Sequence, residues 1–419
     1  MRQVLIPVTS LLAAVAVLLV GHGLQLVLLP LRADSMGWTA TDIGFTGSAY
    51  FLGFVTGCLT LPRLIARIGH IRTFAVLTAI ATSVLLFLAL LDWLPGWLLL
   101  RFLSGWALSG LYMVIESWLN EKAPAEHRGK ILSLYTFITL TGMGGAQLLM
   151  GLAPPEAATL FLLGAGLMVL AIVPVGLTRT IIPHPMPEVS FKPRKLFRNS
   201  QVAVVCAFLS GMITGAFWSL GPVYAGGIGI PVTQIGLFMA VVVFGGAIFQ
   251  FPFGKISDLM DRRRVILGIC VLGIAASLLA ILVAPFSQTL KLVTLAVFGG
   301  AALPLYSICV AHANDYVEGS DFVEVASGIL MMMSLGSVLG PAITAPLMTW
   351  LGPQALFIVA AVCFAVGAMW TAARLSAGAR AREHYQPFKS LPETTPAAFD
   401  IDPRGDEDLT EPQFDPELR

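Results

Sequence analysis

Four polar side chains stand out because each lies inside a long apolar stretch. Arg101 lies in WLLLRFLSGWALSGLYMVI, about 9 Å along a helix from Pro95. His22 and Gln25 lie three positions apart in another apolar run, and therefore on one helix face. Glu116 follows Arg101 by about 22 Å along the same helix, so the two cannot pair directly. A charge in apolar surroundings is costly, and these groups could bind a solute or carry a proton.

Arg101, His22 and Gln25 are predicted to lie at a similar depth. We therefore expect them to form a polar cluster in a cavity, in which neutral His22 accepts a hydrogen bond from Arg101. Arg101 would then favour an anionic or carboxylate-bearing solute. Two alternatives stay open. Arg101 could extend to the outer headgroups of a membrane, and His22 could bond to a backbone carbonyl.

Glu116 lies near the other end of its apolar stretch, and we consider two roles for it. It could pair with Arg67, Arg72 or Arg128 as part of a cytoplasmic gate, which is the interpretation we favour. It could instead be a proton-binding carboxylate, because few other acidic residues lie within the apolar runs.

Further polar and aromatic residues could line a cavity between helices. For any single one of them we favour packing in the interior or anchoring at the membrane surface over contact with a solute. These candidates are Tyr50, Gln147, Trp218, Gln250 and Tyr306.

The composition favours a protein that is solvated by lipid. Of 419 residues, 57% are hydrophobic and 12% are charged, about half the charge of a soluble domain. The net charge of +1 gives no argument for a nucleic-acid partner. The 5 cysteines form no C-x-x-C pair, so no zinc site or disulfide framework is indicated. We find no phosphate-binding loop and no nucleophile motif, and we expect no enzyme, cofactor or metal.

Twelve stretches are long and apolar enough to cross a bilayer as helices. We predict an all-α integral membrane protein with spans near 4–31, 41–62, 72–92, 95–119, 130–152, 157–178, 201–224, 232–253, 264–285, 289–312, 323–349 and 353–375.

The basic residues alternate between the two sides of this arrangement. Of 25 lysines and arginines, only Arg32 and Lys291 fall on the second side, and only Arg101 falls within a span. The positive-inside rule then places both termini and the long middle loop in the cytoplasm. Residues 377–419 are polar and acidic, and we expect a disordered cytoplasmic tail.

The sequence repeats weakly between its two halves. At an offset of 194, residues 101–121 lie over 295–315, with Gly105 over Gly299. At an offset of 192, residues 61–72 lie over 253–264. Two parallel six-helix bundles, related by an axis along the membrane normal, are a transporter architecture.

Three stretches carry a resemblance to a known family, namely GSAYFLGFVTGCLTLPRLIARIGHIRTFA, LYMVIESWLNEKAPAEHRGKILSLY and FWSLGPVYA. Residues 1–376 resemble the major facilitator superfamily and, within it, the poorly characterised bacterial YcaD-like group. The resemblance implies that the fourth-helix Arg101 faces the cavity, followed four positions on by Gly105. It also implies a bacterial inner-membrane protein and, by precedent, a monomer.

The superfamily has approximately G-x-L-A-D-R-x-G-R-R between spans 2 and 3, a loop that latches the cytoplasmic side. In PRLIARIGHIR, Arg67 and Gly69 match, Arg72 ends the stretch, and Ala66 replaces the aspartate. The second half keeps Gly254, Asp258 and the run Arg262, Arg263 and Arg264. The fifth-helix antiporter signature G-x-x-x-G-P is absent from 138–151, which weakens a drug/proton antiporter interpretation.

These observations predict four parts: a bundle at 1–180, a central cytoplasmic loop at 181–200, a second bundle at 201–376 and the tail at 377–419. We predict a secondary active transporter of a small-molecule substrate, driven by protons and working by alternating access. One alternative is an exporter of hydrophobic compounds. Another is a membrane sensor or scaffold that uses a transporter fold without transporting.

Overall fold

A computed structural model describes residues 2–122, 128–176, 193–283, 287–316, 321–376 and 394–396, and every regular element in these ranges is a helix. The helices are α1 Arg2–Ser35, α2 Ala40–Ile68, α3 His70–Leu90, α4 Leu94–Lys122, α5 Arg128–Gln147, η2 Leu148–Leu152, α6 Ala158–Leu170, α7 Ile172–Gly176, α8 Pro193–Asn199, α9 Gln201–Gly227, α10 Val232–Leu259, α11 Arg262–Leu282, α12 Gln288–Asn314, α13 Asp321–Leu351 and α14 Ala355–Ser376.

Within these ranges, 11 candidate spans are long and apolar enough to cross a membrane. The fifth predicted span appears as α5 and the short 3-10 helix η2, whose glycines and threonines lower its hydropathy. The sixth divides into α6 and α7 at Ala171. The break precedes Pro174, whose ring excludes a regular helical bond to the preceding turn. Each remaining predicted span corresponds to a single helix.

The helices begin and bend where the sequence indicates. Thr39 and Asp42 form a capping box at the start of α2, with Thr39 Oγ1 accepting from the Asp42 backbone N–H. Prolines lie inside several helices, for example Pro222 in α9 and Pro304 in α12. Membrane helices tolerate such prolines because neighbouring groups satisfy the freed carbonyls.

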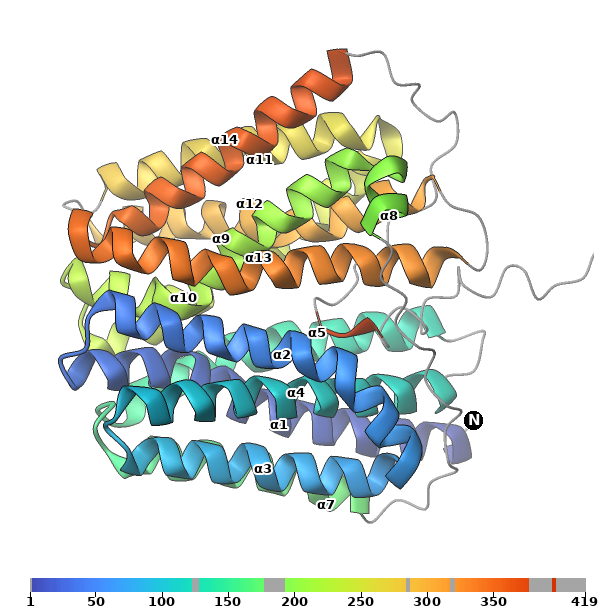
Figure 1. The fold of residues 1–419 in the computed structure, drawn as a ribbon, viewed down its shortest axis with the longest axis vertical. Coiled ribbons are helices and arrows are strands. Elements are labelled where there is room, and N and C mark those ends of the chain that lie inside the picture. Colours follow the sequence, from blue (N-terminus) through green and yellow to red (C-terminus); the bar gives the residue numbers. More distant parts are fainter. Residues whose placement is uncertain are drawn as a thin grey trace, which may run out of the picture.

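The helices form two groups, α1–α7 and α9–α14, which Figure 1 shows as the blue-to-green and green-to-red parts of the ribbon. The groups meet where α2 packs on α13 and on α9, where α5 packs on α10, and where α1 packs on α9. The sequence therefore folds into two bundles that face each other along these helices.

Close glycine contacts recur in both bundles at the offset of the sequence repeat. A Cβ on Gly105 of α4 would lie 1.9 Å from the Tyr50 carbonyl oxygen of α2. A Cβ on Gly299 of α12 would lie 2.0 Å from the Val242 carbonyl oxygen of α10. Only glycine permits so close an approach of two backbones. The α2–α4 pair in one bundle therefore corresponds to the α10–α12 pair in the other.

A second glycine pair repeats in the same way. A Cβ on Gly23 of α1 would lie 2.8 Å from the Met143 carbonyl oxygen of α5. A Cβ on Gly215 of α9 would lie 2.6 Å from the Ser337 carbonyl oxygen of α13. The α1–α5 and α9–α13 pairs thus occupy corresponding places, as expected for parallel repeats.

The bundles touch closely at the end where α2 begins and α13 ends, which the charge pattern predicts to be the outer end. Thr41 Oγ1 and Thr349 Oγ1 lie 2.9 Å apart. A Cβ on Gly44 would lie 2.2 Å from the Ala345 Cβ, and one on Gly236 would lie 2.0 Å from the Gln147 carbonyl oxygen. The described contacts therefore close the predicted outer end.

Large apolar side chains are exposed on many helices. A surface this apolar is typical of contact with lipid and not with water. Examples are Leu59, Leu90, Phe137, Leu162, Ile248 and Met369. The chain is a multi-pass membrane protein whose buried core lies within and between its two bundles.

Candidate functional site

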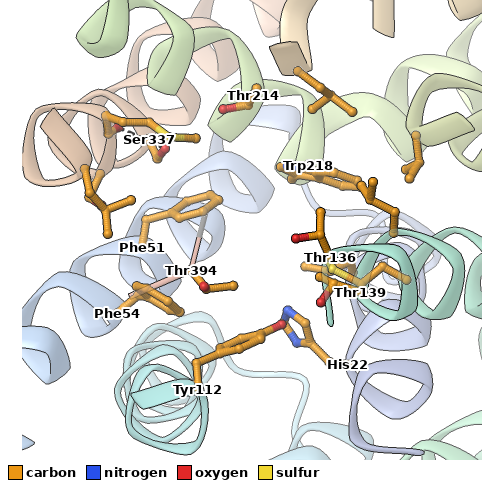
Figure 2. Close-up of a pocket in the computed structure, with 18 of the residues that line it drawn as sticks. His22, Phe51, Phe54, Tyr112, Thr136, Thr139, Thr214, Trp218, Ser337 and Thr394 are labelled. Carbon is orange, nitrogen blue, oxygen red and sulfur yellow. Dashed lines mark hydrogen bonds between the residues drawn. The ribbon is translucent and has the colours of Figure 1, made fainter. Parts of the chain in front are cut away.

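A cavity of about 180 Å³ lies between the two bundles. Among the residues that the structure describes, its lining consists of aromatic, aliphatic, hydroxyl and amide side chains and includes no aspartate, glutamate, lysine or arginine. Figure 2 shows how the labelled residues converge on this space from both bundles. The lining residues are His22, Leu26, Tyr50, Phe51, Phe54, Tyr112, Thr136, Thr139, Leu140, Met143, Thr214, Trp218, Val243, Gln250, Leu303, Ser307, Leu330, Met333, Ser334, Ser337 and Thr394.

His22 of α1 joins several of the predicted residues. Its Nδ1 lies 2.8 Å from Nε2 of Gln25, which lies one helical turn further along α1. Its Nε2 lies 3.5 Å from the Tyr50 hydroxyl of α2, and the Tyr112 ring of α4 meets it edge-on. His22 is buried and reaches the cavity, whereas Gln25 lies behind it.

Arg101 lies behind Tyr50 and is absent from the cavity lining. Its guanidinium carbon lies 4.6 Å from the centre of the Tyr50 ring, a cation–π contact. Arg101 is only 4% exposed, and its Nε and Nη1 atoms have no hydrogen-bond partner among the described residues. Tyr50 therefore links Arg101 to His22. The expected hydrogen bond from Arg101 to His22 is absent from the described bonds, because Gln25 and Tyr50 contact the two ring nitrogens.

Glu116 of α4 is completely buried and accepts three side-chain hydrogen bonds from hydroxyl groups. Tyr135 of α5 donates to Oε1 over 2.8 Å. Thr394 also donates to Oε1, and Thr395 donates to Oε2. This carboxylate is thus held by hydroxyl groups and by no described cation.

The favoured gate partners of Glu116 lie elsewhere. Arg67 and Arg72 are exposed on the surface, and the described partners of Glu116 include neither of them. The side chain of Arg128 lies outside the described residues. The two expected gate partners whose side chains are described therefore do not pair with Glu116 in this conformation.

The remaining predicted lining residues divide into two sets. Trp218 and Gln250 line the cavity, and Gln250 Nε2 donates to the Ser307 hydroxyl over 3.1 Å. Tyr306 and Gln147 are completely buried and do not line it. Gln147 lies at the closed outer end, where both of its amide atoms lack a described partner.

Sequence reasoning missed most of the hydroxyl groups around the cavity. Thr136 and Thr139 of α5 lie three positions apart, as do Ser334 and Ser337 of α13. This spacing places each pair on one helix face. It could have indicated from the sequence that these hydroxyl groups face a common space. Thr394 carried no such signal, because it lies well beyond the last apolar span.

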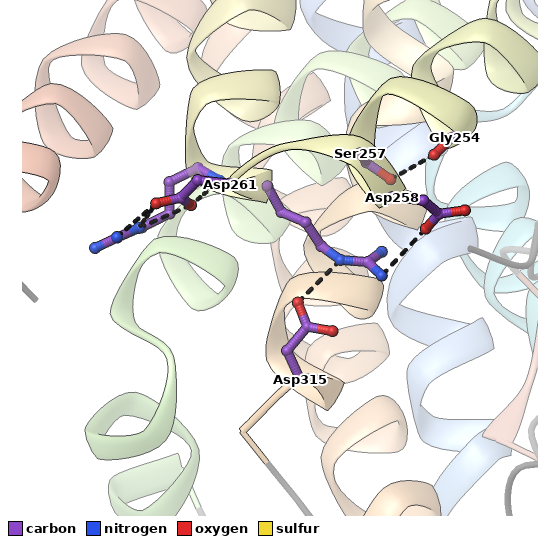
Figure 3. A network of polar contacts seen from close by, with 7 residues as sticks. Gly254, Ser257, Asp258, Asp261 and Asp315 are labelled. Atoms are coloured by element: carbon purple, nitrogen blue, oxygen red, sulfur yellow. Dashed lines mark hydrogen bonds and ion pairs between the residues drawn. The ribbon is translucent and has the colours of Figure 1, made fainter. Parts of the chain in front are cut away.

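The predicted loop signature of the second bundle forms a polar network, which Figure 3 shows between α10, α11 and α12. The buried Arg262 guanidinium contacts Asp258 over 3.4 Å and Asp315 over 2.9 Å. The Ser257 hydroxyl donates to the Gly254 carbonyl over 2.7 Å. These described bonds lie within one bundle, so they tie its helices together and do not bridge to the other bundle.

Asp261 lies between α10 and α11 and caps the N-terminus of α11. Asp261 Oδ1 accepts from the Arg263 backbone N–H over 2.9 Å, and Oδ2 lies 2.6 Å from Arg263 Nη2. Burial raises the pKa of Asp261, but the hydrogen bonds and the charge of Arg263 outweigh it, so the pKa is lowered. Arg264 beside it is exposed.

In the first bundle, Gly69 takes φ +85° and lets α2 turn directly into α3. A glycine is needed there because a side chain would be strained at this φ. Among the described residues, no group of His, Cys, Asp or Glu has the arrangement of a metal site.

Comparison with known proteins places the chain among membrane transporters. A sequence model of the Major Facilitator Superfamily matches residues 11–231 and 203–394. An uncharacterized MFS-type transporter of Enterobacter sp. (strain 638) is 28% identical over 366 residues, which covers 85% of this chain and 93% of that protein. The uncharacterized MFS-type transporter YcaD of Escherichia coli (strain K12 / DH10B) is 28% identical over 364 residues, with the same coverage.

Solved structures share the fold. A variant of the nucleoside transporter NupG superposes with a TM-score of 0.74 at 15% identity, covering 88% of this chain and 99% of that one. A bacterial homologue of the lysosomal transporter Spinster, in an inward-facing and unoccupied conformation, gives a TM-score of 0.71 at 14% identity, covering 88% and 95%.

Proposed function

Because this chain belongs to the Major Facilitator Superfamily, we propose that it is a secondary active transporter of a small neutral solute. The observation that carries the proposal is the cavity between the two bundles, whose described lining residues offer hydroxyl, amide and aromatic groups and include no aspartate, glutamate, lysine or arginine. Uncompensated charge on a solute would be costly in such a cavity. The lining therefore favours a neutral solute over the anionic one that Arg101 alone suggested.

Transport would proceed by rocking of the two bundles around this cavity. In the described conformation, α2 meets α13 and α5 meets α10 at the predicted outer end. Separating these helices would open the cavity to the outside, while the predicted cytoplasmic ends would approach each other. Glycines such as Gly44 and Gly236 have no side chain at the contact between the bundles, so the helices can move past each other there.

Glu116 is our candidate for the proton-binding group. Among the described residues, the buried carboxylates are Glu116 and Asp315, and Asp315 pairs with Arg262. Glu116 has hydroxyl partners, so it can take up a proton without breaking an ion pair. A proton on Glu116 would also remove a buried charge next to the cavity, which couples its protonation to the conformation of the site.

Export of hydrophobic compounds is a second candidate function. It is supported by the apolar part of the lining, which includes Phe51, Phe54, Met143 and Met333. Flexible methionine side chains adapt to ligands of different shape. The two candidates differ in their ligands, since an exporter would bind lipophilic compounds that lack hydroxyl or amide groups.

A thermal-shift screen of the purified protein separates these candidates. It would compare neutral polar solutes (nucleosides included, since the fold relative NupG is named as their transporter), carboxylates and lipophilic compounds. A bound ligand raises the melting temperature. We expect neutral polar solutes to stabilise the wild type, and Trp218→Ala to abolish the shift because Trp218 lines the cavity. Stabilisation by carboxylates alone would contradict the proposal, and stabilisation by lipophilic compounds alone would favour the exporter.

A further inference from the structure

A short piece of the C-terminal segment lies inside the protein. Thr394, Thr395 and Pro396 are all buried, and Thr394 is part of the cavity lining. Figure 2 shows Thr394 in the middle of the cavity view, between Phe54, Thr136 and Tyr112. The expectation of a solvated tail does not describe these three residues. The rest of 377–419 lies outside the described residues.

The contacts of this piece are directed at a single carboxylate. The Thr394 and Thr395 hydroxyls donate to different oxygens of Glu116, and the Thr395 backbone N–H also bonds to the carboxylate. Tyr135 supplies the remaining described donor. A buried carboxylate accepts hydrogen bonds only, and leaving it unsatisfied is costly. The two threonines therefore complete the hydrogen bonding of Glu116.

The location of these three residues affects how a solute could reach the cavity. Glu116 lies about 22 Å along α4 from Arg101, toward the predicted cytoplasmic end. The described contacts between the bundles close the opposite end. The seated residues therefore lie on the side of the cavity that faces away from these contacts.

The chain is long enough to reach this position. α14 ends at Ser376, so the connection to Thr394 can extend over roughly 60 Å at about 3.3–3.6 Å per residue.

We propose that Glu116 and Tyr135 form a binding site for paired hydroxyl groups, and that Thr394 and Thr395 of the chain's own tail are its ligand. The seated tail blocks the cavity from the predicted cytoplasmic end. A solute can then enter from that end only after the tail has left Glu116. This inference rests on the proposed transport function for its biological role but not for its test.

The test measures access to the cavity in the full-length protein and needs no solute or proton gradient. Ser334 lines the cavity, and Ser334→Cys introduces a thiol there with little change in volume. The five native cysteines are all buried, so the protein without this change gives the background. The rate of reaction with a water-soluble fluorescent maleimide is measured in nanodiscs. Ser376→Cys, at an exposed position, serves as the reactivity control.

The decisive comparison is between two matched double variants. T394V/T395V keeps the shape of both side chains but removes both hydroxyls, whereas T394S/T395S keeps the hydroxyls. We expect labelling of Ser334→Cys to be slow in the wild-type and serine backgrounds. In the valine background it should be about tenfold faster or more, because hydrogen bonds to a charged group are lost. Melting temperatures confirm that each variant is folded.

Equal labelling rates in the wild-type and valine backgrounds would overturn the proposal, whether both are slow or both are fast. An equally large increase in the serine background would also overturn it, since the hydroxyls would not be the cause. If the protein did not transport a solute, the expected labelling rates would be the same. The labelling test can therefore overturn the tail proposal without deciding the transport proposal, and the reverse also holds.

Discussion

Arg101 gives a prediction that separates a functional role from a structural one. Its guanidinium is buried and contacts the Tyr50 ring, and its Nε and Nη1 have no hydrogen-bond partner in the part of the chain that the structure describes. Arg101→Met replaces it with an uncharged chain of similar length. We expect the melting temperature to stay the same or rise, because unsatisfied buried donors cost about 1–3 kcal/mol each. Transport should fall, since the group that holds Tyr50 beside His22 is lost.

The measurement for Arg101→Met is a pair of assays, thermal unfolding in detergent and solute flux in proteoliposomes. Arg101→Lys is the matched control, because it keeps the charge but not the planar group that stacks on Tyr50. A large fall in melting temperature for Arg101→Met would show that Arg101 is mainly structural.

The sequence was informative about these residues because polar groups in apolar stretches are conspicuous. His22, Gln25, Tyr50 and Arg101 do lie close to one another, although Tyr50 separates Arg101 from His22. The partners of Glu116 could not be predicted. Thr394 and Thr395 are hydroxyl residues in a polar segment, and only the folded chain brings them to α4.

At the scale of helices, the glycine contacts between α2 and α4 give a prediction about packing. Gly105→Ala would place a Cβ 1.9 Å from the Tyr50 carbonyl oxygen, so the helices must separate. We expect a loss of stability of about 1–3 kcal/mol, as for other overpacking substitutions. Gly166→Ala in α6 is the control, because nothing lies within 4 Å of the new methyl group. Thermal unfolding compares the two, and equal melting temperatures would contradict the packing argument.

The cap of α11 gives a prediction about pH. The Arg263 bonds lower the pKa of Asp261 despite its partial burial, so its contribution to stability is present above its unfolded pKa and is lost as the pH falls through its folded pKa. Asp261→Asn keeps a capping side chain but removes the charge. We expect the variant to be less stable by up to about 1 kcal/mol at pH 7. The difference between the two melting temperatures should begin to shrink below about pH 4 and should disappear only below the lowered folded pKa. A difference that stays constant with pH would contradict this assignment.

The helices themselves were largely predictable, because apolar length sets a membrane span. The departures have local causes. Pro174 divides the sixth span into α6 and α7, and the short 3-10 turn η2 ends the fifth. The repeat offsets also predicted which glycines correspond, as Gly105 and Gly299 show. The resemblance implied that the loop signature of the second bundle acts as a latch, and this stays a prediction, since the bonds described for it join α10, α11 and α12 of one bundle.

For the whole molecule, alternating access requires that the closed outer end opens. Thr41 and Thr349 lie on opposite bundles with their hydroxyl oxygens 2.9 Å apart. We expect the T41C/T349C double variant to form a disulfide on oxidation that holds this end closed. Solute flux in proteoliposomes should stop on oxidation and return on reduction, while each single variant is unaffected. Full flux through the cross-linked protein would contradict the proposed movement.

The most direct test of the account is solute-evoked proton movement, followed with a pH-sensitive dye inside proteoliposomes. The solute is one that stabilises both the wild type and Glu116→Gln in the thermal-shift screen, so that binding is preserved. The wild type should move protons when this solute is added, and so should the control Glu156→Gln, whose side chain is exposed. Glu116→Gln should bind the solute without moving protons. Proton movement at the wild-type rate in Glu116→Gln would contradict the role of Glu116 in coupling.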